Sequence, residues 1–147
     1  DRRLRAALSA AIAHLESLGH DRAEITAALA SFGVGVGARA DLPKAAASAK
    51  PIVDACLAAL AAEGARLLGE GCARRASDVD AVAVAAGLFP RWQGGPMFWA
   101  DQRGLLVLRS DLRHRAEAVP ELYQPHGLFD HLIGAGLNFA SIDRDRV

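Results

Sequence analysis

Apolar residues recur at three- and four-residue spacing along most of this 147-residue chain, and no other feature restricts its fold as strongly. The clearest case is the stretch 3–18, whose apolar positions are Leu4, Ala7, Leu8, Ala11, Ile12 and Leu15. This spacing gathers apolar side chains on one face of an α-helix. The same pattern predicts further helices at 22–32, 51–69, 78–86, 105–118 and 128–135. The predicted fold class is therefore all-α, with helices packed on helices.

Helix-end signals support these boundaries. Gly19 and Gly33 each follow the last periodic residue of a helix, where glycine is the favoured terminator. Asp21 with Glu24 three residues later has the spacing of a capping box at the start of the second helix. Ser77 is the predicted N-cap of the helix at 78–86.

The chain also contains an internal repeat. The stretches "LESLGHDRAEITAALASFG" and "LLGEGCARRASDVDAVAVAAG" share one order of long helix, glycine, polar turn, short helix and glycine. In this alignment Ile25 corresponds to Val79 and Gly33 to Gly87. We interpret the repeat as a duplicated helical unit, with a first domain at 1–43 and a second at 44–147.

Composition and motifs exclude several functions. The 17 basic and 17 acidic residues cancel, which argues against a nucleic-acid partner held through phosphate contacts. No apolar run reaches the ~20 residues of a membrane span. The glycines at 33, 35 and 37 have GxGxG spacing and follow no strand, so they do not predict a nucleotide site. The histidines lack metal-ligand spacing, and we predict no metal site.

The region 52–108 resembles the second C-terminal domain of the multifunctional 3-hydroxyacyl-CoA dehydrogenases of fatty-acid β-oxidation. The resemblance rests on short motifs in a fixed order: Glu63-Gly64, Glu70-Gly71, Ser77 with Asp78 and Asp80, Phe89-Pro90, Gly94-Gly95-Pro96 and Ala100-Asp101. The first half is similar, more weakly, to the preceding domain of these enzymes. It departs from the family pattern at Thr26, where the family has Asp, and at Ala38, where the family has Pro.

The resemblance implies tandem duplicated helical units of the 6-phosphogluconate dehydrogenase C-terminal-like type. In the family such units dock beside an NAD-binding Rossmann domain and a hydratase domain, close over acyl-CoA and form subunit interfaces. We therefore expect no catalytic, cofactor-binding or metal residue in this chain, and we expect NAD in a Rossmann domain outside it. The expected state is a cytoplasmic homo-oligomer. The alternative is a non-catalytic interaction module derived from the same domain.

The segment "GLFPRWQGGPMFWAD" at 87–101 is the candidate functional site. Its glycines and prolines favour a tight turn, and its aromatic rings each offer roughly 150–250 Å² of apolar surface. We interpret it as a wedge between helices, with contact to an acyl or pantetheine chain as the alternative. The candidate residues for either role are Phe89, Pro90, Trp92, Gly94, Gly95, Pro96, Phe98, Trp99 and Asp101.

Four arginines offer weaker candidates. Arg74, Arg75, Arg91 and Arg103 are candidates for contact with a CoA phosphate, against the alternative of a solvated surface. The family has an Asn-Arg pair near the substrate at the start of its first helical domain. The matching positions here are Arg2 and Arg3, and the missing asparagine argues against an auxiliary catalytic role.

Overall fold

The computed structural model describes residues 1–33, 49–90 and 93–145. Its helices are α1 (Arg2–Ser17), α2 (Arg22–Phe32), α3 (Ala49–Gly69), α4 (Ala76–Ala85), α5 (Pro96–Arg103), α6 (Leu105–Ala116), α7 (Pro120–Tyr123), α8 (Gly127–Gly134) and α9 (Phe139–Asp145). No strand occurs among the described residues. The all-α prediction is therefore confirmed.

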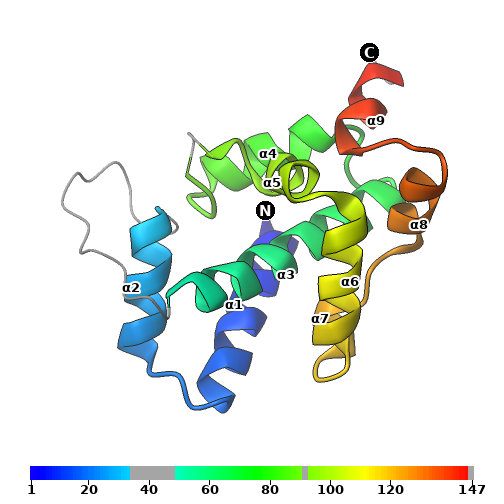
Figure 1. Cartoon of the computed structure of the whole chain (residues 1–147). Helices are drawn as coiled ribbons and strands as arrows, with labels where there is room; N and C mark the ends of the chain where they lie inside the picture. The colour runs from blue at the N-terminus through cyan, green and yellow to red at the C-terminus, as the bar shows by residue number, and fades with distance from the viewer. Residues whose placement is uncertain (34–48, 91–92, 146–147) are drawn as a thin grey trace.

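Helix α3 is the centre of the molecule and crosses the middle of Figure 1. Every residue of the stretch 55–65 is buried, because α1, α2, α5, α7 and α8 pack around it. The stretch is rich in alanine, whose small side chain lets neighbouring helices approach from every direction. A helix that is apolar on all sides is expected to be a buried core helix rather than a surface one.

Helices α1 and α2 both pack against α3, and their buried residues belong to the same hydrophobic cluster as the rest. Gly33 after α2 and Gly87 after α4, which correspond in the predicted repeat, both have positive φ. The predicted boundary between 43 and 44 lies outside the described residues. The division into two domains and the 6-phosphogluconate dehydrogenase-like type stay predictions.

Three short helices differ from the expectations. The aromatic segment, expected to form a turn, enters α5 at Pro96, and α7 begins at Pro120, where no helix was predicted. Helix α9 covers residues for which no helix was predicted. These helices have eight, four and seven residues, so none offers much more than two turns in which apolar periodicity could show.

The predicted N-cap of α4 is wrong by two residues. Arg75 occupies the N-cap position, and Asp78 accepts a hydrogen bond from its backbone N–H at 3.1 Å. Ser77 instead lies within the first turn of the helix. Its own backbone N–H donates to Asp143 of α9 at 3.1 Å.

Candidate functional site

The start of the aromatic segment belongs to the core. Leu88, Phe89 and Pro90 are buried, and the Phe89 ring meets the edge of Phe32 at a centroid distance of 5.6 Å and an angle of 89°. This edge-to-face geometry is favourable for aromatic pairs. The contact joins the end of α2 to the segment that follows α4.

Gly95 is the tightest point of the segment. Its φ is +99°, and a Cβ at this position would lie 2.5 Å from Cβ and 2.6 Å from Cγ of Asp80. Both the backbone conformation and the missing side chain are therefore required. Gly95 is the N-cap residue of α5, and Pro96 fills the first helical position, where its missing N–H costs nothing.

The close approach of Gly95 brings the Asp80 carboxylate onto the N-terminus of α5. Oδ1 of Asp80 accepts from the backbone N–H of Met97 at 2.7 Å, and Oδ2 accepts from that of Phe98 at 3.1 Å. These donors have no partner within their own helix. Asp80 on α4 thus supplies a cap that α5 has no local side chain to provide.

Two more aspartates repeat this arrangement. Asp101 on α5 accepts from the backbone N–H groups of Phe139 and Ala140 at 2.9 and 3.0 Å, capping α9. Asp143 on α9 accepts from Ala76 and Ser77 at 2.7 and 3.1 Å, capping α4. We call Asp80, Asp101 and Asp143 the capping ring, because each carboxylate caps the next of three helices and the third returns to the first.

Burial shifts the pKa of two members of the capping ring, Asp80 and Asp101. Burial raises the pKa of Asp80 to about 7, although its two backbone donors act in the opposite direction. Burial likewise raises the pKa of Asp101. Among the residues that the structure describes, no three His, Cys, Asp or Glu side chains converge as metal ligands. Each carboxylate of the capping ring accepts two backbone N–H groups.

The glutamates of the other shared motifs form a second structural network. Arg3 on α1 binds Glu63 through Nε and Glu70 through Nη1, both at 2.5 Å. Glu63 is buried and also pairs with Arg66 at 2.8 Å, and Arg66 donates to the carbonyl of Leu122 at 2.9 Å. Hydrogen bonding to Arg3 lowers the pKa of Glu70. These contacts fasten α1 and α7 to α3 and occupy the guanidinium of Arg3.

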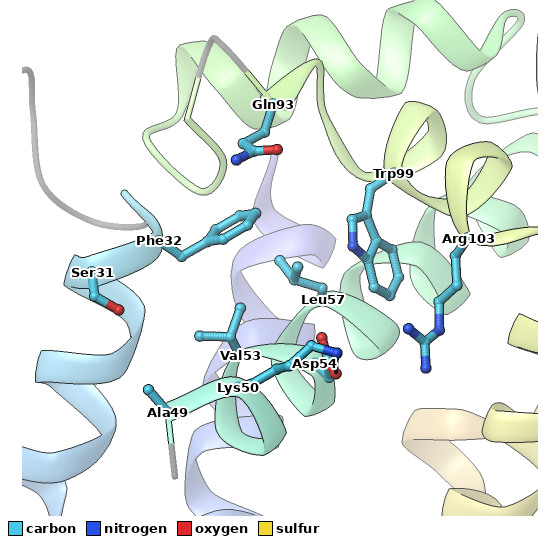
Figure 2. Close-up of a pocket in the computed structure, with 10 residues that line it drawn as sticks. All are labelled: Ser31, Phe32, Ala49, Lys50, Val53, Asp54, Leu57, Gln93, Trp99 and Arg103. Atoms are coloured by element: carbon cyan, nitrogen blue, oxygen red, sulfur yellow. Dashed lines mark ion pairs between the residues drawn. The ribbon is translucent and has the colours of Figure 1, made fainter. Parts of the chain in front are cut away.

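A cleft of about 530 Å³ separates α2, α3 and α5. Its apolar surface comes from Phe32, Val53, Leu57 and Trp99, which Figure 2 shows grouped around the opening. Its polar side chains are Ser31, Lys50, Asp54, Gln93 and Arg103. We call this space the α2–α3–α5 cleft. It is a concave surface of the size that binds small molecules.

The remaining candidate residues lie in different surroundings. Phe98 is 51% exposed, against the expectation that it buries its ring, and Gly94 is also exposed. Trp99 is half-buried and lines the α2–α3–α5 cleft. Trp92 and Arg91 lie outside the described residues.

The other charged candidates show no convergence on one ligand. Arg75 pairs with Asp78 at 3.0 Å, and Arg103 pairs with Asp111 at 2.6 Å. Nδ1 of His126 accepts from the backbone N–H of Leu128 at 3.0 Å, capping α8. This role is not predicted from the sequence, because histidine is an uncommon N-cap residue.

Curated proteins match this chain over part of its length. The peroxisomal bifunctional enzyme of Danio rerio is 36% identical over 87 residues, which are 58% of this chain and 12% of that protein. A glyoxysomal fatty acid β-oxidation multifunctional protein of Brassica napus is 33% identical over 89 residues, 60% of this chain and 12% of that protein. No protein-family model matches the chain.

A bacterial protein extends the match. The fatty acid oxidation complex subunit alpha of Idiomarina loihiensis is 33% identical over 97 residues, 66% of this chain and 14% of that protein. The chain thus spans about an eighth of the length of the curated relatives it matches. The resemblance to multifunctional β-oxidation proteins is confirmed. A match to so small a part of each protein does not assign their activity to this chain.

Proposed function

We propose that this chain, a relative of the multifunctional proteins of fatty-acid β-oxidation, is a helical part of a 3-hydroxyacyl-CoA dehydrogenase that performs no redox chemistry itself. Its role is to complete the acyl-CoA cleft and to form interfaces with the Rossmann and hydratase domains. NAD binds in the Rossmann domain, and the assembled enzyme is a homo-oligomer. The cytoplasmic location stays a prediction, since the named relatives include peroxisomal and glyoxysomal proteins.

The observation that carries this proposal is how the shared motif residues are used. Asp80 and Asp101 accept backbone N–H groups with both carboxylate oxygens, and Glu63 binds two arginines. A general acid or base must instead have an atom within reach of a substrate proton. The contacts of the motif residues therefore favour a structural role over a catalytic one. None of the helices in the described ranges has the length and apolar character that a membrane crossing requires.

The first test measures NADH formation. The purified chain is mixed with NAD and a medium-chain 3-hydroxyacyl-CoA, and absorbance of NADH is followed. We expect no turnover. Turnover by the purified chain would contradict the proposal, because it would require a nucleotide site that the proposal places in another domain.

The second test is a chimera. The matched 87 residues of the Danio rerio enzyme are replaced by those of this chain, and 3-hydroxyacyl-CoA oxidation by the chimera is measured. We expect the chimera to assemble and retain activity, and we expect Gly95→Ala in the chimera to reduce it. Gly71→Ala is the matched control, because Gly71 also has positive φ but no atom within 4 Å of an added Cβ. A folded chimera without activity would favour the derived interaction module.

A further inference from the structure

The guanidinium of Arg103 in the α2–α3–α5 cleft is fixed in place by hydrogen bonds from one of its edges. Arg103 donates to Oδ2 of Asp111 from Nε at 2.8 Å and from Nη2 at 2.6 Å. Both bonds leave from one edge of the planar group. Among the described residues no acceptor is found for Nη1, at the other edge. A guanidinium held in this way retains donors for a second oxygen ligand.

The same arginine lies against the apolar wall of the cleft. Its Cζ is 5.8 Å from the centroid of the Trp99 ring, within the range of a cation–π contact. Figure 2 shows both side chains descending from α5 along one wall, with Leu57 beside the indole ring and Phe32 across the opening. A fixed cationic group therefore lies directly beside a continuous apolar surface.

The other two charged side chains that line the cleft pair with each other. Nζ of Lys50 lies 3.9 Å from Oδ2 of Asp54, and the lysine side chain is 80% exposed. Lys50 thus balances the carboxylate that would otherwise repel an anion. The volume of about 530 Å³ falls within the range of roughly 300–1,000 Å³ typical of small-molecule sites.

We propose that the α2–α3–α5 cleft binds a linear amphipathic anion, with its hydrocarbon chain on Phe32, Leu57 and Trp99 and its acidic group on the Nη1 edge of Arg103. This inference deepens the proposed function and rests on it for the acyl character of the ligand. Two sources share this chemistry, a medium-chain fatty acid and the acyl-CoA itself. An arginine edge suits both, because carboxylate and phosphate oxygens accept paired N–H donors.

The experiment uses Trp99 as a reporter. The chain has two tryptophans, so a Trp92→Phe background leaves Trp99 as the only one. Decanoate, decanol, coenzyme A and decanoyl-CoA are titrated in turn, below their micelle concentrations, while tryptophan emission is recorded. We expect a saturable change with decanoate or decanoyl-CoA, and at least tenfold weaker binding of decanol. Decanoate active alone identifies a fatty-acid site, and decanoyl-CoA active alone identifies a CoA-ester site.

Two variants test the role of the arginine. Arg103→Gln should weaken binding of the anionic ligand about tenfold, the loss expected for a charge-assisted hydrogen bond. Arg109→Gln is the matched control, because Arg109 pairs with Asp130 at 2.6 Å and does not line the cleft. If Arg103→Gln does not fold, the comparison of decanoate with decanol on the Trp92→Phe chain still decides the question.

Three results would overturn this inference. Decanol could bind as tightly as whichever anion binds, coenzyme A could bind as tightly as a decanoyl-CoA that does bind, or no ligand could change Trp99 emission. The failure of the proposed function is a separate event. It would appear as NADH formation by the purified chain or as an inactive chimera, and neither readout depends on occupation of the cleft.

Discussion

Gly95→Ala is the substitution that most sharply separates a tight structural junction from an ordinary turn. The added Cβ would lie 2.5 Å from Cβ and 2.6 Å from Cγ of Asp80. These atoms are close to the α4 backbone, so they cannot swing away as the tip of a long side chain would. Relief requires α4 and α5 to separate, which lengthens the two hydrogen bonds from Met97 and Phe98 to Asp80.

The magnitude has two parts. Alanine at a φ of +99° costs about 1–2 kcal/mol in backbone strain. Overpacking at a closed contact adds about 1–3 kcal/mol. We therefore expect the free energy of unfolding to fall by about 2–5 kcal/mol, of which only the second part depends on the contact with Asp80.

Gly71→Ala isolates the contact. Gly71 has a φ of +77° and nothing within 4 Å of an added Cβ, so its substitution introduces the backbone strain alone. Urea denaturation of the two variants, followed by far-ultraviolet circular dichroism, should show Gly95→Ala less stable by about 1–3 kcal/mol. The thermal midpoints should differ by about 3–10 °C. Equal losses in the two variants would refute the tight junction between α4 and α5.

Asp101→Ala leaves two backbone N–H groups without an acceptor and should lower the free energy of unfolding by about 1–3 kcal/mol in urea titrations. Asp143→Ala should lower the free energy of unfolding less in the Asp101→Ala variant than in the unsubstituted chain, because the first substitution has already opened the capping ring. Strict additivity of the two losses would argue against a closed ring. Glu63→Gln weakens a buried pairing with two arginines and should cost about 1–3 kcal/mol, more than Glu70→Gln at the exposed end of the network; the reverse order in urea would count against it. The native pKa of Asp80 is about 7 and its ordinary value is 3.8, so its stabilising contribution is full below pH 4 and is lost as pH rises through 7. Between pH 4.5 and pH 7.5 the urea midpoint should therefore fall less in Asp80→Asn than in the unsubstituted chain. An equal fall in both would contradict the raised pKa of Asp80.

The long helices could be predicted because apolar residues recur over several turns. Helix α1 has 16 residues, and its predicted apolar positions are buried except for the half-buried Ile12. Helix α3 was predicted with one apolar face, whereas it is buried on all sides between 55 and 65. An alanine-rich sequence indicates that other helices can pack closely on this one, but it does not indicate how many will do so.

Helices α5 and α9 are harder to predict, because side chains distant in sequence cap their N-termini. Asp80 caps a helix that begins 16 residues later, and Asp101 caps one that begins 38 residues later. Neither carboxylate has a local spacing that indicates its partner. Two local signals were available and were missed: Gly95 followed by a proline is typical of a helix start, and Asn138 with Ser141 has the spacing of a capping box.

The candidate site likewise has one part that could be predicted from local sequence and one that could not. The tight turn at Gly95 could be predicted, because two glycines and a proline in succession favour special backbone geometry. The α2–α3–α5 cleft could not, because it joins Phe32, Leu57 and Trp99 from three helices far apart in sequence. Only the packing of α2 and α5 on α3 brings these side chains to one opening.

Amide hydrogen exchange at Phe139 and Ala140 tests most directly whether the shared motif serves structure rather than chemistry. In the unsubstituted chain both amides donate to Asp101, so both should exchange slowly although they lie in the first turn of α9. In Asp101→Ala both should exchange much faster, while the backbone amide of Leu60 in the core of α3 keeps its protection. Fast exchange at both positions in the unsubstituted chain would show that Asp101 is available for another role, and would contradict the account.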